Sequence, residues 1–302
     1  MNRTNAEAAS NSILRVATPE RARLCVFALL LFFVGGSDAA ALLHTRANDF
    51  PQSSQTALTP LQREIEHLRA RLSSSDTEER REAVTRLGAM ARADSSRAAL
   101  PALKDASVVV RATAARAILS LPATEAAAAL LPLLADKDEF VRRETAYALG
   151  ETRSRTAVEA LATALARDKE AGVRGAAAVA LGQIGDEAAT PVLTEAIGRR
   201  IARSGFLNRI TFRRTEENEF VRRSAAVALG RMKSRAAVPA LINALANERA
   251  GDDVRREAAR ALGLIGDPAA IPTLRAALAT RDPYLSEIAS EAIRKLESGK
   301  AV

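Results

Sequence analysis

The most constraining feature of this sequence is a motif that recurs at a nearly constant spacing. Each copy has an anchor residue, an arginine directly after it, and an alanine-rich stretch that in most copies ends in Leu-Gly. The anchors are Glu79, Val110, Val141, Val173, Val221 and Val254, with a degenerate copy at Leu285. Successive spacings are 31, 31, 32, 48, 33 and 31 residues. Such a period predicts stacked helical hairpins, in which each unit buries its apolar face only against its neighbours.

The pattern inside each copy is helical. In one copy Val141, Ala146 and Leu149 fall near one face of a helix. The second helices carry apolar pairs four residues apart, at Leu130/Leu134, Leu161/Leu165, Leu193/Ile197, Leu241/Leu245 and Leu274/Leu278. We therefore expect an all-α superhelix, a solenoid of about seven helical hairpins over residues 76–302.

Start and stop signals recur with the motif. We expect a left-handed glycine to end each first helix, at Gly88, Gly150, Gly182, Gly230 and Gly263. The side chains expected to cap the first helices are Asp76, Ser107, Asp138, Asn218 and Asp282. Those expected to cap the second helices are Ser154, Asp186, Ser234 and Asp267, the last followed by Pro268 at the first helical position.

The units resemble HEAT-like repeats of the phycobilin (PBS) lyase type, whose short form runs VRxxAAxALGxIGD. The stretches Val221–Gly230 and Val254–Asp267 match this form best, and the resemblance covers roughly residues 76 to 298. It implies an armadillo-type α-solenoid. It implies little about activity, because the same unit serves adaptors, lyases and metal enzymes.

Residues 1–39 differ from the repeats and have the layout of an export signal. Arginines precede an apolar run, Leu24–Val34, which is followed by two glycines and a group of small residues. This layout predicts a secretory signal peptide cleaved after Ala39 or Ala41. An uncleaved single-pass membrane anchor is the alternative, although the run is short for a bilayer core of about 30 Å. Both interpretations place the repeats outside the cytoplasm, in a periplasmic or extracellular location.

The segment between this signal and the repeats has two parts. Residues 40–60 are polar and contain Pro51 and Pro60, which predicts a linker. A helical stripe of Leu61, Ile65, Leu68 and Leu72 follows. Because terminal repeats need covering, we expect residues 61–75 to form an N-terminal capping helix, with a coiled-coil dimerisation segment as the alternative.

Charge and cysteine content narrow the range of partners. The formal net charge is +8, which in a cytoplasmic protein favours nucleic acid. An exported chain instead meets anionic lipid, polysaccharide or acidic protein first, so we expect no nucleic-acid partner. The only cysteine, Cys25, precedes the predicted cleavage sites, and a cleaved chain would have neither a disulfide nor a thiol nucleophile.

The recurrent arginines have two interpretations. They are Arg80, Arg111, Arg142, Arg174, Arg222 and Arg255. With Asp or Glu a few residues upstream, such a column is well placed to brace adjoining repeats through charge-assisted bonds. The alternative is a basic stripe for an anionic ligand, and we favour the structural interpretation.

The interval of 48 residues contains an insertion, residues 198–214, that has no acidic residue. It carries the candidate partner-binding residues Arg199, Arg200, Arg203, Phe206, Arg209, Phe212, Arg213 and Arg214. Arg beside aromatic residues is typical of interface hot spots. Glu216, Glu217 and Glu219 follow directly, so part of the charge is open to local neutralisation. The alternative is a second helix extended through Ala202 to Gly205, with its phenylalanines packed on the next repeat.

The sequence offers little for catalysis. The only histidines, His44 and His67, precede the repeats, so no Ser/His/Asp set can form within them. Deoxyhypusine hydroxylase, an iron enzyme built from similar repeats, needs His-Glu pairs as metal ligands, and neither histidine is followed by Glu. We expect no catalytic residues, no metal and no cofactor.

These observations favour a non-enzymatic scaffold or adaptor in the cell envelope, which presents a concave face and a basic side loop to a protein partner of unknown identity. One alternative is a binder of anionic envelope components, such as an acidic protein or surface, through the Arg-rich insertion. A phycobilin-lyase-like enzyme is a second alternative, which converging acidic side chains in a pocket would support.

Overall fold

The computed structural model of the chain describes residues 58–202 and 214–298. The predicted signal segment and nearly all of the predicted linker lie outside the described residues. Among the helices that are described, none is both long enough and apolar enough to cross a membrane.

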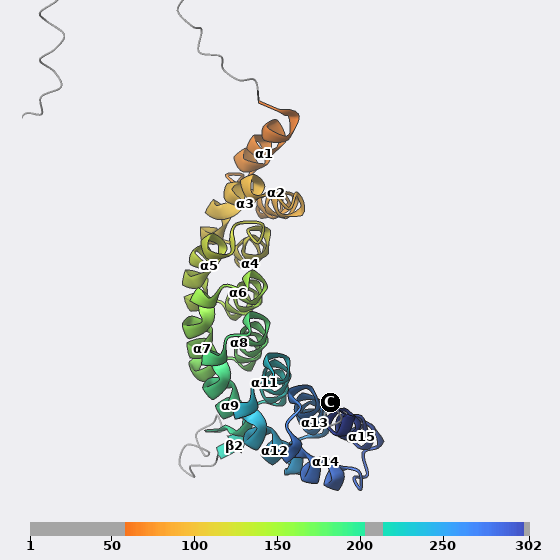
Figure 1. Cartoon of the computed structure of the whole chain (residues 1–302). Coiled ribbons are helices and arrows are strands. Elements are labelled where there is room, and N and C mark those ends of the chain that lie inside the picture. The colour runs from red at the N-terminus through yellow and green to blue at the C-terminus, as the bar shows by residue number, and fades with distance from the viewer. Residues whose placement is uncertain (1–57, 203–213, 299–302) are drawn as a thin grey trace, which may run out of the picture. The chain divides into compact units, whose positions relative to one another are not determined.

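Six helical hairpins make up the described part of the chain, with one further helix before them and one after (Figure 1). The first helices of hairpins 1 to 6 are α2 (Thr77–Ala89), α4 (Val108–Ala117), α6 (Glu139–Thr152), α8 (Ala171–Ile184), α11 (Glu219–Met232) and α13 (Asp252–Ile265). The second helices are α3 (Ala93–Ala99), α5 (Ala123–Leu130), α7 (Val158–Arg167), α9 (Thr190–Gly198), α12 (Val238–Ala246) and α14 (Ile271–Ala277). Before and after them lie α1 (Pro60–Arg71) and α15 (Pro283–Ser298). The prediction of an all-α solenoid is confirmed.

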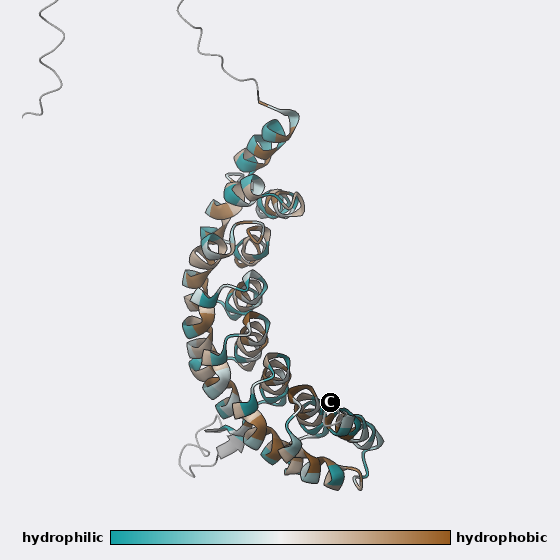
Figure 2. Ribbon diagram, viewed as in Figure 1, coloured by the Kyte–Doolittle hydropathy of each residue, from teal (hydrophilic) through white to brown (hydrophobic). Residues whose placement is uncertain are grey.

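The hairpins stack in two rows. Each first helix packs against the first helix of the next hairpin, and α15 continues that row after α13. The second helices form the other row (Figure 1). Hydrophobic and hydrophilic residues alternate along the helices of both rows (Figure 2), as expected of helices that bury one face and expose the other.

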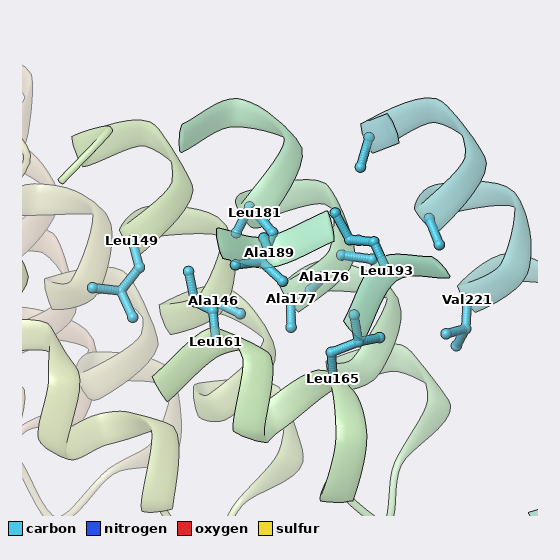
Figure 3. Packing of buried hydrophobic residues seen from close by; sticks show 14 of the residues in the cluster. Ala146, Leu149, Leu161, Leu165, Ala176, Ala177, Leu181, Ala189, Leu193 and Val221 are labelled. Carbon is cyan, nitrogen blue, oxygen red and sulfur yellow. The ribbon is translucent and has the colours of Figure 1, made fainter. Parts of the chain in front are cut away.

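The core is a continuous layer of small aliphatic side chains between the two rows. Figure 3 shows Leu161 and Leu165 of α7 lying close to Ala177 of α8. These side chains are fully buried, as are Leu149, Leu181 and Leu193. With alanine and leucine supplying most contacts, neighbouring helices approach closely, and each hairpin depends on the next for burial.

The recurrent glycines do not end the first helices, which corrects our expectation. Gly182 lies inside α8, and a Cβ built on it would be 2.7 Å from both the Cα and the Cβ of Ala228 in α11. The other members of the column face an alanine of the next first helix in the same way: Gly88 faces Ala117, Gly150 faces Ala180, Gly230 faces Ala261 and Gly263 faces Ala292. The position needs glycine because the two helices approach too closely to leave room for a side chain.

The left-handed residue comes three positions after each of these glycines. These residues are Ala91, Arg153, Gly185, Lys233 and Gly266, with φ between 50° and 79°. In hairpin 2, which lacks the glycine, α4 ends at Ala117, before the equivalent position at Leu119 is reached. The glycine therefore serves packing between hairpins, and the end of the helix is a separate feature of the chain.

The expected caps are confirmed in part. Four of the five first-helix residues accept a bond from a backbone N–H of the first turn: Asp76, Asp138, Asn218 and Asp282. Ser107 does not. Of the second-helix set, Asp186 and Asp267 accept such bonds, whereas Ser154 and Ser234 make none. Pro268 occupies the first position of its turn, as predicted.

The second helices are of two kinds. In hairpins 1 and 2 the α-helix ends early and the chain continues as a 3₁₀ turn, over Leu100–Lys104 and Leu131–Ala135. In hairpins 3 to 6 a short 3₁₀ turn comes first and the α-helix follows. Pro101 and Pro132 account for the first kind, because a proline ring inside an α-helix clashes with the carbonyl four residues before it.

Two of the predicted apolar positions are less buried than expected. Leu134 is only partly buried, because the 3₁₀ turn directs Leu133 into the core in its place. Leu278 is 42% exposed, because α14 ends at Ala277. The segment predicted as a capping helix, residues 61–75, overlaps α1, which begins one residue earlier, at Pro60, and ends at Arg71. Ile65 and Leu68 of α1 are buried against hairpin 1.

Candidate functional site

The recurrent arginines form a ladder of ion pairs along hairpins 1 to 3. Arg111 of α4 donates from Nε to Oδ2 of Asp136 at 2.8 Å and from Nη2 to Oδ1 at 3.0 Å. The same two-bond contact joins Arg80 to Asp105 and Arg142 to Asp168. Each aspartate lies in the loop after the second helix of its own hairpin. Paired bonds between guanidinium and carboxylate fix orientation as well as distance.

Each arginine also holds the loop that precedes its own helix. Nη1 of Arg111 donates to the backbone oxygens of Asp105 and Ala106, at 2.8 and 3.0 Å. Asp105 therefore receives Arg80 on its carboxylate and Arg111 on its carbonyl. Arg142 and Arg174 repeat this pattern at Asp136 and Asp168. The acidic residue upstream of each arginine thus contributes its backbone carbonyl. The carboxylate that pairs with the arginine lies 25 or 26 residues downstream, whereas the sequence had pointed to the upstream acidic residue.

The ladder lowers the pKa values of its aspartates. Burial on its own would raise the pKa of the Asp136 carboxyl, but the hydrogen bonds from Arg111 and from the N–H of Asp138 outweigh it, so the pKa lies below its usual value. Asp105 and Asp168 behave in the same way, with Arg80 and Arg142 as the arginine donors. The folded protein therefore favours the ionised form of these carboxylates.

The fourth junction takes its carboxylate from the far end of the insertion. At the position equivalent to Asp168 the chain has Arg199, and Arg174 pairs instead with Glu217. The bonds measure 3.0 Å from Nε to Oε2 and 2.6 Å from Nη2 to Oε1. The side chain of Glu217 is fully buried. Glu217 is thus the equivalent of the ladder aspartates.

A short antiparallel pair of strands forms the base of the insertion. Arg200–Ala202 (β1) pairs with Arg214–Glu216 (β2), with Ile201 opposite Thr215. The N–H of Glu217 donates to the carbonyl of Arg199 at 2.8 Å and extends the pairing by one bond. The alternative of a second helix extended through Ala202 to Gly205 is wrong, because α9 ends at Gly198 and the chain turns into a strand.

Arg199 is bonded to the end of hairpin 3. Its guanidinium donates to the carbonyl oxygens of Leu165 and Ala166 at the end of α7. It also lies 4.0 Å from Glu217. Since the last carbonyls of a helix lack partners within the helix, Arg199 satisfies the end of hairpin 3 while it starts the insertion. Its predicted contact with a partner stays a prediction.

Glu216 serves the fifth junction. Its carboxylate accepts from Nη1 of Arg222 and, at 3.2 Å, from the side-chain amide of Asn247. Arg222 also donates to the carbonyl of Ile197 at 2.9 Å. Glu216 and Glu217 are therefore bonded to residues of the framework, and among the described arginines of the insertion Glu217 lies within ion-pair distance of Arg199.

In the last hairpin the two-bond contact is made by the arginine one residue after the predicted position. Arg255, the predicted member, donates from Nε to the carbonyl of Leu245 at 3.0 Å. Arg256 makes the two-bond contact, from Nε to Oδ2 of Asp282 at 2.8 Å and from Nη2 to Oδ1 at 3.0 Å. Asp282 also caps α15, so the same carboxylate starts the final helix and closes the ladder.

The structure accounts for only part of the predicted binding set. Arg200 lies in β1 and Arg214 in β2. Five members lie outside the described residues, namely Arg203, Phe206, Arg209, Phe212 and Arg213. The ladder carboxylates and Glu217 were not among the predicted site residues. The sequence does contain a signal for these carboxylates. An Asp follows each of the first three arginines after 25 or 26 residues, and Arg199 takes the place of this Asp where the insertion starts.

Over residues 58–202 and 214–298, no group of three or more His, Cys, Asp or Glu side chains is placed to hold a metal ion. The carboxylates that come together do so around arginines. Their geometry neutralises charge and joins hairpins, and it leaves these oxygens bonded within the framework.

Comparison with known proteins identifies the repeat. The family model for HEAT repeats matches residues 65–149, 128–203 and 209–294. The chain belongs to the HEAT repeat family. A search of curated protein sequences found no match.

Among solved structures, the YibA protein of E. coli is 22% identical, with 78% of this chain and 82% of that chain covered and a TM-score of 0.55. The CpcE and CpcF complex of phycocyanin lyase from Nostoc sp. is 23% identical, with 83% and 98% covered and a TM-score of 0.46. Human deoxyhypusine hydroxylase is 22% identical, with 78% and 84% covered and a TM-score of 0.39. The likeness to YibA concerns the fold alone, which is that of an α-solenoid.

Proposed function

We propose that this HEAT repeat protein is a non-enzymatic scaffold that binds a protein partner through the insertion between α9 and α11. The observation that carries the proposal is a contrast in charge pairing between the ladder and the insertion. Asp105, Asp136, Asp168 and Glu217 are each bonded to a framework arginine. The segment 203–213 adds three arginines and two phenylalanines, without an acidic residue, to a base that is tied into the solenoid.

The anchoring of the base supports a binding role. Arg199 is bonded to α7, Glu217 to α8, and Glu216 to α11 and to Asn247. A segment whose two ends are held by buried ion pairs gives up less conformational freedom on binding than a free loop does. Arginine and aromatic side chains are the residues that carry most binding energy at protein interfaces.

We further propose that the scaffold acts in the cell envelope, on the basis of the export signal predicted in residues 1–39. The unit type is proposed to be the phycobilin-lyase HEAT-like repeat, on the basis of the stretch Val254–Asp267. A lyase-like activity has no support from the described carboxylates, because those that converge are paired with arginines.

Affinity capture from cell envelopes tests the scaffold function. The full chain is compared with a variant in which Arg203, Arg209 and Arg213 are replaced by Ser. A matched control replaces three exposed arginines away from the insertion, Arg153, Arg231 and Arg235. A defined protein that is retained by the control and lost by the insertion variant is the expected result. Equal capture by all three proteins contradicts the proposal.

One observation favours a second function, the binding of anionic envelope components. Glu216 and Glu217 are bonded to the framework, and segment 203–213 has three arginines and no acidic residue in its own sequence. Binding of the full chain to anionic lipid vesicles, strongly weakened between low and moderate salt, is the result expected for this alternative. Salt-independent binding, or none, would exclude it.

A further inference from the structure

A groove crosses the second helices of hairpins 1 to 3. It consists of two adjoining hollows that share Pro132. The first lies between the segments of hairpins 1 and 2 and is lined by Leu100, Ala128 and Ala129 among others. The second lies between α7 and the 3₁₀ turn of hairpin 2 and includes Leu131 and Ala160.

The prolines of hairpins 1 and 2 produce this groove. Pro101 and Pro132 end α3 and α5 early, and the chain continues as a narrower 3₁₀ turn. The second helix of hairpin 3 has no proline. In hairpins 4 to 6 the proline is near the start of the second helix, as at Pro239, where it does not interrupt the helix. Small residues such as Ala128, which is exposed, leave the floor shallow and apolar.

The charges along the groove are distributed unevenly. Lys104 and Arg167 are exposed, and each directly precedes a ladder aspartate, so the two occupy equivalent places along one edge. Neither forms an ion pair among the described residues. Glu159 lines the groove at the other end of α7, eight residues from Arg167, or about 12 Å along the helix.

The remaining charged groups that line the groove are neutralised in place. Arg97 makes a two-bond contact with Glu125, at 3.0 Å for each bond. Arg111 is paired with Asp136, and Asp168 with Arg142. The available charge of the groove is therefore positive along the edge that holds the ladder loops and negative only at Glu159.

We propose that this groove binds an acidic amphipathic segment of a partner protein. Its apolar side chains would cover Ala128, Ala129 and Pro132, and its acidic side chains would face Lys104 and Arg167. Apolar burial supplies the affinity, whereas the charges fix the direction of the segment and speed its association. This inference rests on the proposed scaffold function and gives that function a second contact, separate from the insertion.

Selection from a random library of displayed 12-residue peptides tests the groove without knowledge of the natural partner. The full chain is the bait. We expect enriched sequences to combine Leu, Ile or Phe with several Asp or Glu. Enrichment of basic sequences, or of none, overturns the proposal.

Three variants then locate the binding. Ala128→Glu, and Lys104→Glu together with Arg167→Glu, should each weaken the selected peptide by at least tenfold. Arg231→Glu, an exposed substitution on α11 far along the chain, is the control and should change the affinity less than twofold. Because all these positions are exposed, circular dichroism should show intact folding. Equal affinity of every variant overturns the proposal.

The two functional proposals fail separately. A natural partner that is lost with the insertion variant, but binds normally when Ala128 and Lys104 are changed, leaves the scaffold function standing and contradicts the groove. A peptide that binds the groove while no partner depends on the insertion gives the opposite result.

Discussion

The junctions within hairpins 1 to 3 and the junctions beside the insertion use the same arginine column but take their carboxylates from different places. In the first group, the aspartate directly follows the second helix or the 3₁₀ turn that continues it, and lies 25 or 26 residues after its arginine. Beside the insertion, Glu217 and Glu216 arrive from the far end of a strand pair and bond to Arg174 and Arg222. The solenoid thus keeps its bracing while its chain is interrupted.

The difference shows how a repeat protein can accept an insertion. Long surface insertions cost little in chain entropy, but this one starts at the ladder position itself and removes an aspartate. The loss is offset because β1 and β2 return the chain to the same junction, with a glutamate in reach. The anchored base of the insertion is therefore part of the framework.

Acid should have the largest effect, because it acts on the whole ladder. The pKa values of Asp105, Asp136 and Asp168 are lowered in the folded chain, so the unfolded chain binds protons first as the pH falls. Their contribution to stability is complete above about pH 4, the ordinary range of aspartate, and is lost as the pH drops through the lowered values. Urea unfolding at a series of pH values measures this.

A single substitution should reduce that pH dependence. Asp136→Asn removes one of the titrating groups, so its stability should fall less steeply below pH 4 than that of the unmodified chain. A free energy of unfolding that stays constant from pH 5 to pH 2.5 in the unmodified chain contradicts the ladder.

The next largest effect is expected at Glu217. Glu217→Gln keeps the shape of the side chain but leaves the buried Arg174 without its counter-charge. It also removes the negative charge near Arg199. Removal of one partner from a buried pair costs about 3 to 5 kcal/mol. Asp168→Asn is the matched change in the regular ladder and should cost the same or less. A cost near zero for Glu217→Gln would mean that the insertion junction is not braced.

Packing between hairpins is tested by two glycines of one helix. Gly182→Ala places a Cβ 2.7 Å from Ala228, so α8 and α11 must move apart, at a cost of about 1 to 3 kcal/mol. Gly172→Ala, near the start of α8, meets only the side chain of Arg143 at 3.6 Å. It should be neutral or stabilise by up to about 1 kcal/mol. Thermal unfolding of both variants gives the sign, and equal effects would contradict the assigned contact.

The smallest effect is expected in segment 203–213. Replacement of Arg203, Arg209 and Arg213 by Ser should shift the free energy of unfolding by no more than about 0.5 kcal/mol, as surface changes usually do. Circular dichroism and urea unfolding check this. A loss comparable with that of Glu217→Gln would place these arginines in the framework.

The sequence predicted the repeat, its helical hairpins and most of its core, because these depend on periodic apolar residues such as Leu161, Leu193 and Leu241. It misassigned the glycine column, since Leu-Gly at a helix end and Leu-Gly at a helix contact look the same in one dimension. The close approach of Gly182 to Ala228 exists only once two hairpins are stacked.

The candidate site was less predictable. The role of the arginine column as a brace followed from its regularity, but its carboxylate partners are separated from it by a complete hairpin. Glu217 is 43 residues from Arg174, and no local pattern links them. The groove at Pro132 depends on where a proline falls along a second helix, a difference that becomes meaningful only when neighbouring hairpins are compared.

A double-mutant cycle on Arg174 and Glu217 tests most directly whether this ion pair anchors the insertion in the same way as the Arg–Asp pairs join hairpins 1 to 3. The variants are Arg174→Met, Glu217→Gln and their combination, with Arg142→Met and Asp168→Asn as the reference cycle. We expect a coupling energy of about 1 to 3 kcal/mol at both junctions. Effects that add at Arg174 and Glu217 within about 0.5 kcal/mol, while the reference pair is coupled, would contradict the anchored insertion.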